Sequence, residues 1–194
     1  MKKFLLTLLA VLFVTAQVSA AENPVRIARL PIIFQNAQPD AETCVELEVK
    51  LARATHIPLN GTLQVAEYLP PVESAQVLNK LWQSMRSRDK KFKIQQAMRP
   101  LAEELDADII VCPILRRYNQ NVSIGSYETY LSSSVSAELI IYDRRTDELV
   151  DKKFSRMYHD AMSGFGTASF LAKECFDRLI DQTKLRQRIY AVGR

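Results

Sequence analysis

The segment HDAMSGFGTASF, residues 159–170, contains the residue types that catalytic and phosphate-binding loops use. A histidine, an aspartate, a serine and two glycines precede an amphipathic run. However, its Gly-x-Gly lacks the third glycine of a dinucleotide loop, and it follows the outer arm of a hairpin instead of the first strand of a β-α-β unit. We therefore expect the glycines to let the chain reverse, and Ser163 or Thr167 to cap the following helix.

Two binding hypotheses remain for this segment. A helix N-terminus presents free N–H groups and the positive end of the helix dipole, which attract anions. The residues of this weak anion site would be Gly164, Gly166 and Thr167. The second hypothesis is a cleft for a small ligand at the strand ends, near residues 159–166.

Few other residues could carry catalysis. The two histidines, His56 and His159, are expected in a loop and at a strand end, so no His-rich metal cluster is predicted. Cys175 could come close to His159, but it falls on the apolar face of a predicted helix, where burial makes a thiol unreactive. No Gly-Lys-Ser/Thr phosphate loop occurs. We expect no catalytic residues, no cofactor and no metal; an enzyme of unknown reaction is the weaker alternative.

The cysteines, Cys44, Cys112 and Cys175, are odd in number and widely spaced. In an oxidising compartment one pair could form a disulfide. Cys44 and Cys175 both fall on apolar faces of predicted helices, so this pair is the candidate bridge. The alternative is three small buried hydrophobic residues.

The N-terminus, MKKFLLTLLAVLFVTAQVSA, has the pattern of a secretory signal peptide with cleavage near Ala20. Its apolar run is shorter than the roughly 20 residues of a membrane-spanning helix, and no cysteine marks a lipid-attachment site. Cleavage removes Lys2 and Lys3, so the net charge falls from +4 to +2. We expect residues 21–194 to form a single periplasmic or secreted domain with a basic C-terminal tail.

Two surfaces have the composition of contact sites. The first is the polar arm from residue 118 to 130, whose tyrosines supply contact area at low entropic cost; an ordinary exposed hairpin is the alternative. The second is the basic tail, which could meet an acidic partner or, at most, contact a membrane peripherally. The small net charge after cleavage and the exported address argue against nucleic acid. The candidate contact residues are Tyr118, Tyr127, Tyr130, Arg186, Arg188 and Tyr190.

Hydrophobic periodicity predicts the elements that position these residues. Strands are expected at 25–34, 62–68, 107–117, 135–142 and 149–159, and helices at 40–55, 72–85, 90–98 and 168–180. Pro100 is expected to break or kink the third helix. Pro113 cannot donate to a sheet ladder, so we expect a bulge or a change of neighbouring strand there. This order predicts an α/β (α+β) domain with a mixed sheet of about four to five strands and a long C-terminal amphipathic helix.

The signal peptide, the strands RIARLPIIF and ADIIV, the hairpin turn YDRRTDELV and the closing helix together resemble the TolB N-terminal and curli-secretion-lipoprotein (CsgG-like) periplasmic α/β domains. In the turn, Asp143 and Thr146 match the residues that these domains often carry, and Asp147 stands in place of a glycine. The resemblance implies an anticodon-binding-like topology and an envelope protein that binds other proteins, sometimes as an oligomer, and is not an enzyme. The sequence thus favours a protein–protein interaction or assembly module with envelope protein partners or copies of itself.

Overall fold

The computed structural model describes residues 24–89 and 91–191, so the predicted signal peptide lies outside the described residues. The described chain forms one mixed sheet with helices packed on it, as predicted. Its strands are β1 (Val25–Arg29), β2 (Ile33–Phe34), β3 (Ala66–Leu69), β4 (Ile109–Ile124), β5 (Thr129–Asp143) and β6 (Glu148–Ala161). Its helices are α2 (Ala41–Thr55), α3 (Asn60–Leu63), α4 (Pro71–Arg88), α5 (Ile94–Glu104), η1 (Gly164–Gly166), α6 (Ala168–Gln182) and α7 (Leu185–Tyr190).

The sheet has the order β3-β1-β4-β5-β6, and β2 continues the track of β1 beside β4. β1, β2 and β3 run parallel to their neighbours, whereas β4, β5 and β6 are antiparallel. The six strands exceed the expected four to five because the predicted strand 25–34 is divided around Pro31 into β1 and β2. The predicted change of neighbour at Pro113 is confirmed, since β4 pairs with β1 before this residue and with β2 after it.

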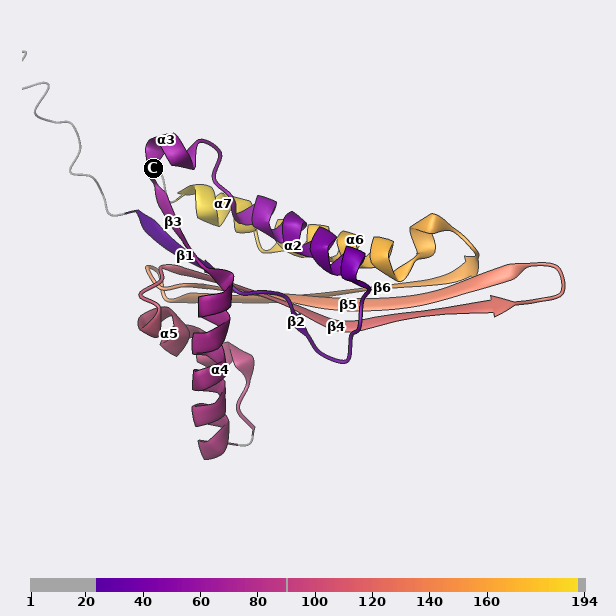
Figure 1. Cartoon of the computed structure of the whole chain (residues 1–194), viewed down its shortest axis with the longest axis horizontal. Helices are drawn as coiled ribbons and strands as arrows, with labels where there is room; N and C mark the ends of the chain where they lie inside the picture. The colour runs from indigo at the N-terminus through magenta and orange to yellow at the C-terminus, as the bar shows by residue number, and fades with distance from the viewer. Residues whose placement is uncertain (1–23, 90, 192–194) are drawn as a thin grey trace, which may run out of the picture.

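Helices cover both faces of the sheet, as Figure 1 shows: α2, α6 and α7 lie on one face and α4 and α5 on the other. Side chains alternate along the strands, so β1, β4 and β5 each contribute to two separate cores. Ile109, Val111 and Ile141 belong to the core under α2 and α6, while Ile110 and Ile140 belong to the core under α4 and α5.

α2 begins where the predicted helix 40–55 begins, and the Asp40 carboxylate caps it by accepting a hydrogen bond from the Thr43 backbone N–H at 2.8 Å. Its buried face runs through Thr43, Leu47 and Leu51. Cys44, which we expected on this face, is only half-buried. The periodicity alone did not show that Thr43, and not the neighbouring Cys44, is the buried residue of the first turn.

The predicted break of the third helix at Pro100 and the predicted start of the second strand at residue 62 were wrong. α5 continues through Pro100 to Glu104, because Pro100 removes one backbone hydrogen bond while Ala97, Met98 and Leu101 remain fully buried. The predicted strand 62–68 starts late, at Ala66, because Asn60 donates from its side-chain amide to the Ala66 carbonyl and accepts from the Ala66 N–H, both at 2.8 Å. This clamp holds residues 60–63 as the short helix α3.

The C-terminal helix is also divided. α6 ends at Gln182, and Lys184 adopts a left-handed conformation with φ of 52° before α7 begins. The change of direction lays Leu185 and Ile189 into the core beside α2. Within residues 24–89 and 91–191, none of these helices has the length and apolar character needed to span a membrane.

Candidate functional site

The β4–β5 hairpin forms an arm that extends past α6 and away from the helices (Figure 1). Its strands stay paired from Arg117–Ser136 outward to Ile124–Thr129. The Gly125 N–H donates to the Glu128 carbonyl at 2.9 Å and closes the turn. Residues 118–130, which were expected to form a polar arm, are therefore part of a regular hairpin.

Apolar side chains are exposed near the tip of this arm. Tyr127 is fully exposed and Ile124 is 83% exposed, while Val122 and Tyr130 are each about two-fifths exposed. Soluble proteins usually leave such groups scattered, and a cluster at a protruding end is typical of a contact surface. Two of the three predicted tyrosines, Tyr127 and Tyr130, therefore lie where a partner could reach them.

Tyr118 lies at the root of the arm instead. Its hydroxyl donates to the Asp40 carboxylate at 3.3 Å and lies 3.5 Å from the Thr43 hydroxyl. Burial raises the pKa of Tyr118. This tyrosine joins β4 to the first turn of α2, so its position indicates a structural role.

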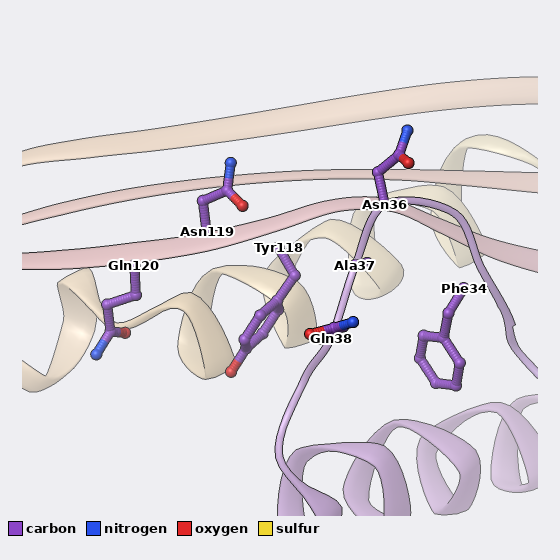
Figure 2. Close-up of a pocket in the computed structure, with 7 residues that line it drawn as sticks. All are labelled: Phe34, Asn36, Ala37, Gln38, Tyr118, Asn119 and Gln120. Atoms are coloured by element: carbon purple, nitrogen blue, oxygen red, sulfur yellow. The ribbon is translucent and has the colours of Figure 1, made fainter.

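An open hollow of about 900 Å³ adjoins this root. Figure 2 shows Tyr118 and Gln120 on one side of β4, with Asn119 pointing to the opposite side. The chain between β2 and α2 forms the other wall. The lining residues are Phe34, Asn36, Ala37, Gln38, Tyr118, Asn119 and Gln120. The ligand cleft expected near residues 159–166 does not coincide with this hollow, because nothing in the sequence places the 34–38 connection beside β4.

The outer half of β4 has an open edge on the same side. The segment after β2 last touches β4 at the Ala37–Tyr118 bridge and then turns toward α2. Among the described residues, no strand pairs with this side of β4 from Asn119 to Ile124. Unpaired edges of this kind can accept a strand from another chain.

The segment 159–170 ties the arm to α6. Ser163 accepts from the Phe165 N–H and caps η1, and Thr167 accepts from the Phe170 N–H and caps α6, each at 3.3 Å. The Ala168 N–H donates to the Gln120 side chain at 2.7 Å. Two donors at the start of α6 are thus used within the chain, which weakens the case for an anion site at Gly164, Gly166 and Thr167.

The glycines serve a different purpose from the one expected. Neither Gly164 nor Gly166 has a positive φ, so neither is needed for a left-handed turn. A Cβ on Gly166 would lie 2.3 Å from Cδ1 of Tyr158, whereas one on Gly164 would meet no atom within 4 Å. Gly166 is required by close packing between η1 and β6.

The expected basic tail is largely docked on the domain. The Arg188 guanidinium binds both carboxylate oxygens of Glu148, at 2.8 and 3.0 Å, and donates to the Thr183 carbonyl at 3.0 Å. The Tyr190 hydroxyl reaches the His56 carbonyl at 3.4 Å. Arg186 remains exposed and available to a partner. Residues 192–194 lie outside the described part of the chain.

The structure does not contain the candidate Cys44–Cys175 bridge, since all three cysteines are free. Burial raises the pKa of Cys175 to about 12, and burial also raises the pKa values of Cys112 and Cys44. Cys175 faces the core from α6, whereas Cys44 lies at the half-buried margin of α2. Within the described residues, no three histidine, cysteine or acidic side chains are grouped as metal ligands.

A buried acidic residue was missed by the sequence analysis. Glu138 on β5 is fully buried and pairs with Arg116, while its other oxygen accepts from Gln95 at 3.1 Å. Burial raises the pKa of Glu138, and Arg116 opposes this effect. Glu138 stood at an ordinary alternating position among serines, so no local signal indicated its burial.

Comparisons with known proteins give structural likenesses only. No family model and no curated protein matches the chain. A lipoprotein of Neisseria meningitidis, GNA1162, is 15% identical over 81% of this chain and 99% of its own, with a TM-score of 0.36. The hypothetical protein CT253 of Chlamydia trachomatis is 14% identical over 87% of this chain and 99% of its own, with a TM-score of 0.42.

A PelC dodecamer from Paraburkholderia phytofirmans is 13% identical over 87% of this chain and 93% of its own chain, with a TM-score of 0.44. The names of the neighbouring structures give no support to the TolB-like and CsgG-like resemblance.

Proposed function

We propose that the protein is an exported envelope protein that acts by binding another protein, and that the β4–β5 arm makes the contact. The observation that carries this proposal is the protruding hairpin, on which Ile124 and Tyr127 are exposed beyond the helices. The N-terminal signal pattern supports the exported location. The partner is a second envelope protein or another copy of this chain.

The arm is a rigid support for the exposed side chains at its tip. Its strands are paired along their whole length, and Gln120 fastens the root to the first residue of α6. A paired hairpin presents its tip with little conformational entropy left to lose on binding. Burying an exposed isoleucine or tyrosine in a partner's pocket would contribute about 1.5–3 kcal/mol for each side chain.

Photo-crosslinking in cells tests the proposal. A photoreactive amino acid at position 127 should capture a defined partner, and the same group at Val45 on α2, which is also exposed, should not. The double variant Ile124→Ser, Tyr127→Ser, with the crosslinker moved to position 126, should lose the captured species. Its melting temperature should stay unchanged, because both side chains lie outside the cores.

Two results would contradict the proposal. One is an equal pattern of crosslinks from the arm and from α2, and the other is undiminished capture by the double variant. Light scattering of the purified protein identifies the case in which the partner is a second copy, since the double variant would then lower the measured mass.

A further inference from the structure

A bulge in β4 places two arginines side by side. Leu115 pairs with Ala137 and Arg117 pairs with Ser136, so Arg116 is one extra residue in β4. Two residues of a bulged strand oppose one residue of its partner, which re-aims the local side chains. Arg116 reaches Glu138, and Arg117 shares its cross-strand row with Ser136; both partners belong to the face of the sheet opposite α6.

The two guanidinium groups lie at a polar hollow of about 300 Å³ on that face. Figure 2 shows Asn36 directed to the same side as Asn119 and away from Tyr118. In the floor of the hollow, the Ser155 hydroxyl donates to the Ser136 hydroxyl at 2.9 Å. The lining residues are Gln35, Asn36, Arg116, Arg117, Ser136 and Ser155. Each carries a hydrogen-bond donor, and none is an acid.

The charges around the hollow leave one arginine free. Glu138 neutralises Arg116 from below, and Lys153 lies 3.6 Å from the same carboxylate. Arg117 is exposed, and within residues 24–89 and 91–191 no carboxylate forms an ion pair with it. A guanidinium group binds carboxylate or phosphate through two parallel hydrogen bonds. The hollow therefore combines a free positive charge with neutral donors.

The same face continues outward along the arm as rows of amides and hydroxyls. Asn119 lies opposite Ser134, and Asn121 lies opposite Ser132. No helix covers this part of the sheet in Figure 1, because α4 and α5 lie at its other end. Asparagine and serine side chains both donate and accept, so they match the hydroxyl groups of a sugar.

We propose that this face binds an acidic saccharide, with its carboxylate or phosphate at Arg117 and its neighbouring sugars along the asparagine and serine rows. This site is separate from the arm tip, so the saccharide proposal does not depend on the proposed protein contact. Arg116 positions the site, since its pairing with the buried Glu138 fixes the bulge. Arg117 contacts the ligand.

Calorimetric titration of the mature protein tests the inference with three probes: tetragalacturonate, neutral maltotetraose and inorganic phosphate. We expect tetragalacturonate to bind with a Kd below about 1 mM and maltotetraose to bind far more weakly. Arg117→Gln should weaken tetragalacturonate binding about 10- to 100-fold, which corresponds to the loss of a charge-assisted hydrogen-bonded pair. Arg178→Gln, the same change at an exposed position on α6, should leave it unchanged.

The variant Asn121→Ala separates the sugar rows from the anion contact. This variant should weaken the binding of tetragalacturonate and leave the binding of phosphate unchanged. Binding of phosphate alone would overturn the saccharide assignment. Equal losses in Arg117→Gln and Arg178→Gln, or no binding of tetragalacturonate, would overturn the site. Arg116→Gln is unsuitable because it would remove the guanidinium that pairs with the buried Glu138 carboxylate.

Discussion

Gly166 lies against the ring of Tyr158 so closely that a Cβ on Gly166 would be 2.3 Å from Cδ1 and 2.4 Å from Cε1 of that ring. Gly166→Ala must push η1 away from β6, and overpacking of this kind costs about 1–3 kcal/mol. We expect Gly166→Ala to lower the free energy of unfolding by this amount, as measured by urea denaturation.

Gly164→Ala is the matched control, because a Cβ there meets no atom within 4 Å. It should leave stability unchanged or raise it by about 0.4–1 kcal/mol through the unfolded state. Tyr158→Ala should make the Gly166→Ala change nearly neutral. If the two glycine variants were equally stable, the packing explanation would be wrong.

Asp147 adopts a left-handed conformation with φ of 54°, which is the conformation that a glycine at this turn position would favour. It accepts from the Tyr142 hydroxyl at 2.7 Å and pairs with Arg99. The Tyr142 hydrogen bond, followed by Arg99, lowers the pKa of Asp147. A lowered carboxyl pKa stabilises the fold above the unfolded pKa, and this contribution is lost as the pH falls through the folded pKa.

Asp147→Asn should therefore unfold at lower urea concentration than the native protein at pH 7, and the gap should narrow below about pH 4. Asparagine tolerates the left-handed conformation, so the backbone is not strained. A gap of constant size from pH 7 to pH 3 would show that the charge of Asp147 is not responsible.

The three thiols should differ in reactivity. Cys112 and Cys175 are buried with raised pKa values, so they should react with a maleimide only when the domain unfolds. Cys44 is half-buried and should react first. Mass spectrometry of the protein labelled at pH 8, with and without urea, identifies each site. Rapid labelling of Cys175 in the native protein would contradict the structure.

The last helix should behave as part of the core. Ile189 is fully buried beside α2, so Ile189→Ala should reduce the free energy of unfolding by about 2–4 kcal/mol. Arg186→Ala, on the exposed side of α7, should change it by less than about 0.5 kcal/mol. Equal effects of the two substitutions would mean that α7 does not dock as described.

The fold could be predicted largely because its elements carry strong local patterns. The buried positions of α6, including Leu171, Cys175 and Leu179, follow the predicted stripe. The helix that begins beside Asp40 and the strand β5 were likewise predicted from their periodicity. Each of these signals arises from contacts within one element or from the choice of its buried face, so the sequence contains it directly.

The site was less predictable because it depends on which elements meet. The arm tyrosines were identified from the sequence, but Tyr118 binds Asp40 beside α2 instead of lying on a free surface. Arg188, expected in a basic tail, pairs with Glu148 of β6. Burial of Glu138 depends on Gln95 of α5 and Arg116 of β4, which are distant in sequence. No window of the chain contains the three together, so periodicity could not reveal them.

The extra residue at Arg116 also determines which residues of the outer half of β4 face α2 and α6. Before the bulge, odd-numbered residues such as Val111 and Leu115 face α2 and α6; after it, even-numbered residues such as Tyr118 and Gln120 do. Deleting one residue at the bulge would make Leu115–Ala137 and Arg117–Ser136 consecutive pairs of a regular ladder, so Tyr118 and the asparagines beyond it would keep their β5 partners and their faces. The arm should therefore keep its orientation after the loss of one residue at this point, and the cost should be the lost Arg116–Glu138 ion pair.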